Sequence, residues 1–242
     1  MKILVTAGNT QVPIDRVRCI TNIFTGRTGS WIALAAYRRD HAVTLLTSHP
    51  SAVDLASVPA GPRWAVHTYR TFDELRAEMG SAIKSGEFDA VIHSAAVSDY
   101  LLDGVYAPGT GTSFDPSAGN WSGSPVAALV DRSAGKIKSE EPELWLRLVR
   151  APKLIDCIRP DWHFSGTLVK FKLEVGASEE ELRKIAETSR KDADLMVANT
   201  LEGAHEWAMI GPIHGKYERV WRDDLPDRLL EIVEQKLAGN LQ

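Results

Sequence analysis

Short apolar runs alternate with amphipathic segments along most of the chain. The apolar runs predict buried parallel strands, and they lie at residues 3–5, 42–47, 64–69, 89–97, 167–175 and 194–198. The amphipathic segments predict helices, and they lie at residues 29–39, 71–86 and 178–192. Two of these helices begin at Thr71 and Ser178, each three residues before a glutamate, as in a capping box. Strands that alternate with helices predict right-handed βαβ units and an α/β fold with a parallel sheet.

The pattern changes after the fourth strand. Residues 101–135 hold six glycines and show little periodicity, which predicts a long flexible arm inserted into the domain. An alternating strand at 144–149 and a short helix at 153–158 follow the arm. A closing hairpin and a C-terminal amphipathic helix come last, at residues 207–210, 217–221 and 225–237. We therefore expect one domain over residues 1–242, with a Rossmann-like parallel sheet, flanking helices and a single inserted arm.

Composition narrows the classes of function. The chain has 28 Lys and Arg residues against 32 Asp and Glu residues, a net charge of −4, so it lacks a basic field for nucleic acid or a membrane surface. Cys19 and Cys157 alone cannot build a disulfide framework or a cysteine zinc site. The seven histidines lack metal-ligand spacing, so we expect no bound metal. Without signal-peptide anatomy or an apolar run of about 20 residues, the predicted location is the cytoplasm.

The first candidate for chemistry is the loop at residues 22–29, which opens the first helix. Gly26 and Gly29 would let the backbone approach a phosphate, and the helix N-terminus supplies N–H groups and a positive dipole end. The dinucleotide-binding fingerprint does not fit, because only Gly8 follows the first strand and residues 47–50 end the second strand without a carboxylate. A mononucleotide phosphate is therefore the better prediction.

Two further segments could meet a ligand. Ligands of such sheets bind at the carboxyl ends of the strands, which places residues 8–10 and 98–100 in one crevice. Small residues at 94–96 would allow a close approach to the main chain, with Asp99 offering a carboxylate. The alternative, left open, is that residues 94–96 pack under a helix and that Asp99 begins a turn. His93 is interpreted as a core histidine.

A pair of lysines follows the arm. Lys136 and Lys138 stand two residues apart, so they would face the same side of a strand and could close over a polyphosphate. A solvated charged edge is the alternative interpretation.

Taken together, six segments form a series with a known counterpart. They are VRCITN at 17–22, TGRTG at 25–29, AAVSDY at 95–100, KIK at 136–138, VKFKLE at 169–174 and ADLMVAN at 193–199. In this order they resemble the phosphopantothenate–cysteine ligase family of coenzyme A biosynthesis, over residues 2–200. The chain looks most like the stand-alone form, which lacks the flavin-dependent decarboxylase half.

The resemblance implies a reaction and its requirements. A nucleoside triphosphate, CTP or ATP with Mg²⁺, activates the carboxylate of 4′-phosphopantothenate, and pyrophosphate leaves. The amine of free cysteine then attacks the acyl-nucleotide and releases CMP or AMP. The resemblance also implies no flavin, a homodimer in which the neighbouring subunit completes each site, and a separate decarboxylase protein as a possible partner.

Residue roles follow only from matching positions in that family. The implied catalytic residues are Asn22, Lys136 and Arg18. The implied nucleotide-binding residues are Gly8, Thr25, Gly26, Gly29, Lys136, Phe171, Lys191 and Asn199. The implied substrate-binding residues are Arg18, Asn22, Ala95, Ala96 and Asp99. Asn22 would face the activated oxygen, Lys136 would neutralise the phosphates, and Arg18 would reach across the dimer.

Two alternative functions stay open. Phe24, Lys170 and Thr200 depart from the family pattern at the nucleotide site, which favours a repurposed, non-catalytic relative that binds a nucleotide or a phosphopantetheine-like ligand. A short-chain oxidoreductase would need a Tyr-x-x-x-Lys pair, but Tyr37 is followed by His41, and Tyr100 by Gly104.

Overall fold

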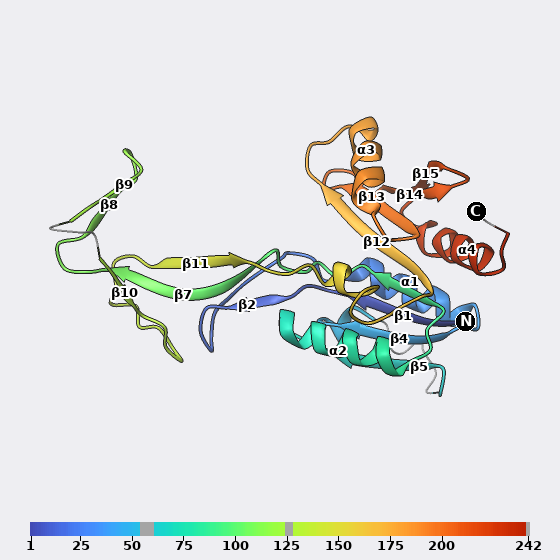
Figure 1. Ribbon diagram of the computed structural model, residues 1–242, viewed down its shortest axis with the longest axis horizontal. Helices are drawn as coiled ribbons and strands as arrows, with labels where there is room; N and C mark the ends of the chain where they lie inside the picture. Colours follow the sequence, from blue (N-terminus) through green and yellow to red (C-terminus); the bar gives the residue numbers. More distant parts are fainter. Residues whose placement is uncertain (54–60, 124–127, 241–242) are drawn as a thin grey trace. The chain divides into compact units, whose positions relative to one another are not determined.

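The computed structural model describes residues 1–53, 61–123 and 128–240, and the chain divides into two compact units (Figure 1). The first, which we call the sheet unit, comprises Met1–Thr10, Ile23–Val97 and Lys153–Gln242. The second, the arm unit, comprises Gln11–Asn22 and Ser98–Pro152. The arm therefore draws on two stretches of sequence, whereas the sequence indicated only one. One domain over residues 1–242 stays a prediction.

The sheet unit is built on eight strands, in the order β15-β14-β13-β12-β6-β1-β4-β5. Their bounds are β1 (Lys2–Ala7), β4 (Ala42–Thr47), β5 (Trp64–Thr68), β6 (Ala90–His93), β12 (Thr167–Glu174), β13 (Leu195–Thr200), β14 (Trp207–Ile213) and β15 (Lys216–Trp221). The strands from β13 to β5 are parallel, and only β14 and β15 run antiparallel to their neighbours. The predicted Rossmann-like sheet and its closing hairpin are confirmed.

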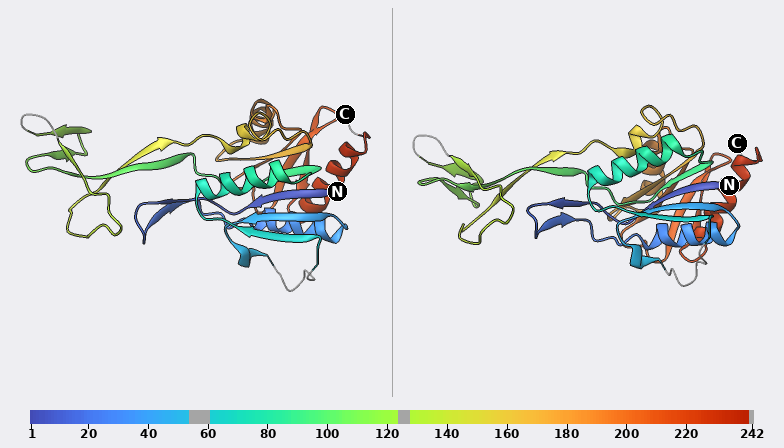
Figure 2. Two further views of the ribbon diagram at one scale, coloured as in Figure 1. Left: turned by 60° about the horizontal axis from the view of Figure 1, so that its bottom comes forward. Right: turned by 90° about the horizontal axis from the view of Figure 1, so that it is seen from below.

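Within the described residues, four α-helices flank this sheet. They are α1 (Arg27–Arg38), α2 (Phe72–Ser85), α3 (Glu179–Arg190) and α4 (Leu225–Leu237), with short 3₁₀ turns at Pro50–Ala52 and Leu154–Cys157. The crossovers β1–α1–β4 and β5–α2–β6 run in opposite directions along the sheet. Right-handed connections must then place α1 and α2 on opposite faces, as Figure 2 shows.

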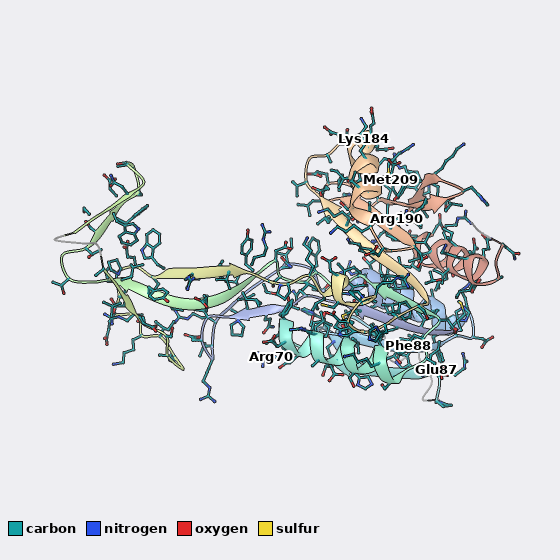
Figure 3. The ribbon with its side chains drawn as sticks, in the orientation of Figure 1. Arg70, Glu87, Phe88, Lys184, Arg190 and Met209 are labelled. Carbon is teal, nitrogen blue, oxygen red and sulfur yellow. The ribbon has the colours of Figure 1, made fainter. Side chains whose placement is uncertain are left out.

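The buried side chains separate along the same two faces. Alternate residues of β1 and β13, such as Val5 and Val197, share one apolar cluster with α1 and α4. Met196 and Met209 pack instead with Leu182 of α3 on the other face, and Figure 3 marks Met209 close to α3. The sheet is thus covered on both sides, as a parallel sheet requires. No helix among the described residues is long and apolar enough to cross a membrane.

The helix starts follow two different designs. Both predicted capping boxes are present, at Thr71 and Ser178, each with reciprocal bonds to a glutamate. Helix α1 begins two residues earlier than predicted, at Arg27, and its N-cap is Gly26 in the left-handed conformation. Gly29 therefore lies inside the first turn of α1, and does not precede it.

The arm unit is more regular than its sequence suggested. Its strands are β2 (Gln11–Pro13), β3 (Cys19–Thr21), β7 (Tyr100–Pro108), β8 (Ser113–Asp115), β9 (Asn120–Ser122), β10 (Leu129–Asp131) and β11 (Trp145–Arg150). The central strand β7 pairs antiparallel with both β10 and β11. The expectation of little regular structure in residues 101–135 was wrong where these residues are described; residues 124–127 lie outside the described part.

Cross-strand aromatic contacts explain the extra order. Phe114 of β8, Trp121 of β9 and Trp145 of β11 form a cluster with ring centroids 4.5 to 5.2 Å apart. Such ring pairs stabilise paired strands. Because Trp145 is distant in the sequence, local periodicity could not reveal the cluster.

Candidate active site

The sheet unit contains a point at which the strand order reverses, between β1 and β6. In open α/β sheets ligands bind at such a point, beyond the carboxyl ends of the strands. The chain beyond both strands is tied together there, because the N–H of Ala96 donates to the carbonyl of Gly8 (2.8 Å) and Asn9 bridges to Ala96. The Ser94 hydroxyl donates to the carbonyl of Thr6 (2.6 Å). The structure thus places Ala95 and Ala96 directly beside Gly8.

The start of α1 lies against this same point. A Cβ added to Gly26 would come within 2.0 Å of the Gly8 nitrogen, and one added to Gly29 within 2.4 Å of the Ser94 hydroxyl oxygen. Gly26 also has a φ of 78°, which favours glycine. Packing therefore requires glycine at both positions. Gly8, Gly26, Gly29, Ala95 and Ala96 are brought together.

The first turn of α1 forms a positively charged environment. Helix N-termini carry unpaired N–H groups and a partial positive charge. The first turn of α1 has no acidic residue and begins with Arg27, whereas α2, α3 and α4 each have an acidic first turn. Thr25 is exposed just before the helix, and Phe24 is 36% exposed. An anion would be stabilised here.

Three more predicted residues come from β12, β13 and the end of α3. Phe171 and Asn199 lie on neighbouring strands, two register positions apart, and both are half-buried. Phe171 packs against the core cluster that includes α1 and α4, so it faces the side of α1. Lys191 is the exposed C-cap of α3, whose face of the sheet is the opposite one. The structure therefore does not bring Lys191 together with Phe171.

The residues that depart from the family pattern have structural partners. Alternation along β12 turns Lys170 away from the face of Phe171, and its Nζ donates to the carbonyl of Ser189 (2.7 Å). Thr200 is buried, and its hydroxyl accepts from the N–H of Gly203 (3.1 Å). Neither side chain occupies the face that Phe171 shares with α1.

The arm unit holds the other four predicted residues, Arg18, Asn22, Asp99 and Lys136. Arg18 donates to the carboxylate of Asp15 (2.7 Å) and to the carbonyl of Ile137 (2.9 Å). Lys136 is exposed between Gly135 and Ile137, and both of these neighbours bond to residues of the turn at 15–18. The structure therefore brings Arg18 and the Lys136 segment together. Residues 136–138 form no strand, so the predicted strand was wrong.

Asp15 is the residue that sequence reasoning missed. Its carboxylate accepts from the N–H groups of Val17, Arg18 and Ile137 and from the Arg18 guanidinium. The Arg18 guanidinium, together with the N–H groups of Val17 and Ile137, holds the pKa of Asp15 well below its ordinary value. The local Asp-x-Val-Arg turn was visible in the sequence, but the partner 122 residues away was not.

Asn22 and Asp99 lie on separate segments of the arm unit. Asn22 is half-buried at the end of the first arm segment, and Asp99 is exposed. Backbone bonding places Asp99 beside β11, because its carbonyl accepts from the N–H of Ala151 (2.8 Å). Asp99 and Lys136 therefore lie in the arm unit on separate segments, each fixed by main-chain bonds.

Histidine and metal chemistry have little support among the described residues. His93 is buried and bonds to the Thr6 hydroxyl (2.8 Å); burial and the charge of Lys170 lower its pKa to about 4. The interpretation as a core histidine agrees with its burial and its hydrogen bond. No three His, Cys, Asp or Glu side chains gather in the described ranges in a way that could hold a metal ion.

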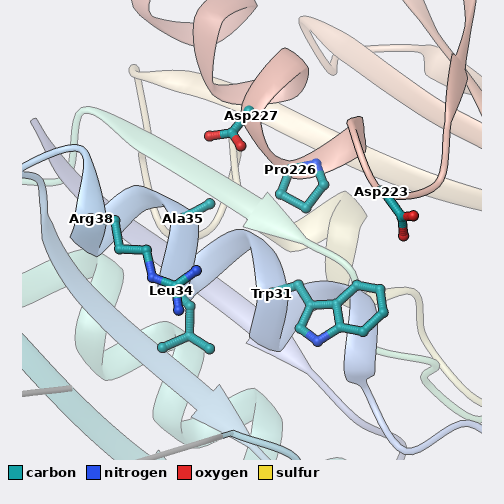
Figure 4. Close-up of a pocket in the computed structure, with 7 residues that line it drawn as sticks. All are labelled: Trp31, Leu34, Ala35, Arg38, Asp223, Pro226 and Asp227. Carbon is teal, nitrogen blue, oxygen red and sulfur yellow. The ribbon is translucent and has the colours of Figure 1, made fainter. Parts of the chain in front are cut away.

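A cavity lies outside all the predicted residues. It is formed between α1 and the start of α4, as Figure 4 shows. Its lining residues are Trp31, Leu34, Ala35, Arg38, Asp223, Pro226 and Asp227. Of these lining residues, Trp31 lies nearest the first turn of α1.

Comparison with known proteins finds a matching family model and similar relatives. Residues 1–107 match the family described as DFP, the DNA/pantothenate metabolism flavoprotein C-terminal domain. The coenzyme A biosynthesis bifunctional protein CoaBC of Thermococcus kodakarensis is 31% identical over 243 residues, covering 98% of this chain and 51% of the relative. The chain therefore spans about half the length of the curated relatives that it matches.

Solved structures agree in fold. The crystal structure of the DNA/pantothenate metabolism flavoprotein from Streptococcus pneumoniae aligns with a TM-score of 0.75 and 26% identity, over 98% of this chain and 99% of that chain. A Cab2 mutant solved in complex with phosphopantothenate-cysteine aligns with a TM-score of 0.68 and 16% identity, over 98% and 86% of the two chains.

The contact between Gly26 and Gly8 can be tested by substitution. Gly26→Ala introduces both a disfavoured positive φ, costing about 1–2 kcal/mol, and an overlap with the Gly8 backbone, costing about 1–3 kcal/mol more. Gly215→Ala is the matched control, because Gly215 has nearly the same φ (77°) but open space around it. In urea unfolding, Gly26→Ala should lose more stability than Gly215→Ala. Equal losses of stability in the two variants would show that the backbone of Gly8 shifts at little cost to make room for the added methyl group.

The role of Asp15 can be tested at a single amide. Because its folded-state pKa lies below its ordinary value of about 4, the ionised carboxylate stabilises the turn above that pH, and acidification through the folded-state pKa removes it. At pH 6, Asp15→Asn should raise the hydrogen-exchange rate of the Ile137 amide severalfold. Asp131→Asn is the control, since Asp131 bonds only locally, to the N–H of Ser133. An unchanged Ile137 rate in Asp15→Asn would contradict the role.

Proposed function

We propose that this chain, whose residues 1–107 match the family of the DNA/pantothenate metabolism flavoprotein C-terminal domain, joins 4′-phosphopantothenate to L-cysteine. The observation that carries the proposal is the meeting of α1, Gly8 and residues 95–96 at the β1–β6 switch point. The N-terminus of α1, which would bind a phosphate, lies beside the segment that we expect to hold the substrate. The 31% identity to a coenzyme A biosynthesis protein over nearly the whole chain supports the same reaction class.

The proposed reaction has two steps. A carboxylate oxygen of phosphopantothenate attacks the α-phosphorus of the nucleoside triphosphate, and the bond to pyrophosphate breaks. The cysteine amine then attacks the acyl carbon, loses a proton, and displaces the nucleoside monophosphate. Both steps develop negative charge on oxygen, which fixed donors and cations stabilise.

The sheet unit would bind the nucleotide. The N–H groups at Gly26 and in the first turn of α1, with the Thr25 hydroxyl, are proposed to hold the phosphates. Phe171 would pack against the base, with Asn199 on the same face, while Lys191 contributes charge from the end of α3. Gly8 provides the space that allows α1 this close to the strand end.

The arm unit would supply the groups that act on the substrate. Arg18 is proposed to bind the substrate, in the dimer from the neighbouring subunit, and Asp15 orients its guanidinium in the single chain. Lys136 would neutralise charge as pyrophosphate leaves. Asn22 would donate to the activated oxygen, and Asp99 would take part in binding phosphopantothenate.

The proposed nucleotide is CTP or ATP with Mg²⁺. Magnesium prefers oxygen ligands and often keeps substrate phosphates among them. Because the described residues offer no acidic cluster for a protein-built cage, the ion would arrive with the nucleotide. A homodimer, a cytoplasmic location, the absence of flavin and a separate decarboxylase partner belong to the same proposal.

A repurposed binding protein is the second candidate function. Of the three departures that favoured it, Lys170 and Thr200 have structural roles away from the face of Phe171. Phe24, exposed beside the start of α1, remains its support.

Pyrophosphate release tests the proposed function directly. The purified protein is given 4′-phosphopantothenate, Mg²⁺ and either CTP or ATP, with and without cysteine. Release with one nucleotide, strongly accelerated by cysteine, is expected. Release that ignores cysteine would point to another amine, and no release with either nucleotide would favour the repurposed relative.

Two substitutions should separate the steps. Lys136→Gln should slow pyrophosphate release because the phosphates lose a neutralising charge, by about ten- to a hundredfold, and Lys136→Arg, which keeps the charge, should retain more activity. Asn22→Asp should allow pyrophosphate release and block amide formation. If Lys136→Gln and Asn22→Asp both turn over at the normal rate, the residue roles are wrong.

A further inference from the structure

Arg222 is a cation at the start of α1 that no motif in the sequence assigned. It follows β15, which runs parallel to β1 and so ends at the same edge of the sheet. Its N–H donates to the carbonyl of Glu206 (2.7 Å), which fixes the backbone. Its guanidinium bonds to the hydroxyl of Thr28, in the first turn of α1, and lies over the Trp31 ring, 5.6 Å from the centroid.

The charge of Arg222 has little local compensation. Burial and the neighbouring charge of Arg27 lower the pKa of its guanidinium, against a smaller opposite effect of Asp223. Among the described residues, neither Arg222 nor Arg27 forms an ion pair with a carboxylate. Cations that are partly buried are normally paired. Here two lie close together, at a helix end that is itself positive.

Two other half-buried arginines of the sheet unit show a contrast. Arg39 and Arg228 each form an ion pair with a glutamate, Glu234 and Glu218 respectively. Their guanidinium pKa values are raised, in the opposite direction to that of Arg222. Arg39 and Arg228 thus have a carboxylate that compensates their charge, whereas Arg222 has none among the described residues.

We infer that Arg222, with Arg27, binds the phosphates of the nucleoside triphosphate at the first turn of α1. The inference rests on the proposed function for the identity of the ligand. Guanidinium groups suit this role because their planar donors match phosphate oxygens in pairs. Thr28 and Trp31 hold Arg222 in place before the ligand arrives, which lowers the entropy lost on binding. An anion with several charges relieves the repulsion between the two arginines.

Binding measurements test Arg222 apart from catalysis. Titration calorimetry gives the dissociation constants of MgCTP, MgATP and inorganic pyrophosphate for each variant. Arg222→Gln should lower the affinity for the triphosphate by about ten- to a hundredfold, and Arg222→Lys should recover part of that loss. The affinities of the variants for pyrophosphate should follow the same order. Pyrophosphate lacks the base, so its binding depends on the phosphate contacts alone.

The matched control is Arg219→Gln. Arg219 also belongs to β15 and lies over the rings of Trp207 and Trp221, but it has an ion pair with Glu179. This variant should bind triphosphate as tightly as the wild type. Thr28→Val removes the bond to Arg222 and keeps both positive charges, so it should bind more tightly than Arg222→Gln. The unfolding free energy of each variant is measured alongside.

The outcomes distinguish this inference from the proposed function. Unchanged affinity in Arg222→Gln would overturn it, as would a wild-type protein that binds no triphosphate. Equal loss of affinity in Thr28→Val and Arg222→Gln would also overturn it, because Arg222 would then act only by fixing α1. Triphosphate binding that depends on Arg222, in a protein that releases no pyrophosphate, would support the inference while rejecting the ligase.

Discussion

The close contact between α1 and the end of β1 is the constraint on which the sheet unit depends. It exists because Gly26 lies against the backbone of Gly8, and because Gly29 leaves room for the Ser94 hydroxyl and the Ala7 side chain. A larger side chain at either helix position would lift α1 from the strand. The same contact brings the N-terminus of α1 to the β1–β6 switch point, so packing and the proposed anion binding would make the same demand on these glycines.

A different interaction organises the arm unit. Asp15 joins the turn that carries Arg18 to the segment that carries Lys136, through four donors from two distant parts of the chain. Removing one acceptor would leave several donors without partners, which is costlier than losing a single bond. One carboxylate thus holds the Arg18 side chain and the backbone next to Lys136, and it touches no substrate in the proposed mechanism.

The sequence predicts those features that are encoded locally. Capping boxes at Thr71 and Ser178 depend on residues three apart, and the helix at 225–237 and the strand at 42–47 depend on simple periodicity, so their bounds agree with the structure. The bond between Asp15 and Ile137 depends on chain closure over 122 residues, and no local pattern encodes it. Candidate residues were recognised through a family series, whereas Arg222 lies beyond the part of the chain that the series covers.

Helix α1 begins without the acidic residues that α2, α3 and α4 have in their first turns. An acidic first turn stabilises a helix, and α2, α3 and α4 each have one. Helix α1 has Arg27 at this position and Arg222 bonded to its first turn, an arrangement that costs stability in the unliganded protein. Natural sequences depart from local rules mainly at functional sites. The N-terminus of α1 and both guanidinium groups would attract an anionic ligand. The electrostatic interactions at this position, which are unfavourable in the free protein, would then become favourable. The same positions that weaken the free helix would then strengthen the bound one, which couples the order of α1 to occupation of the site.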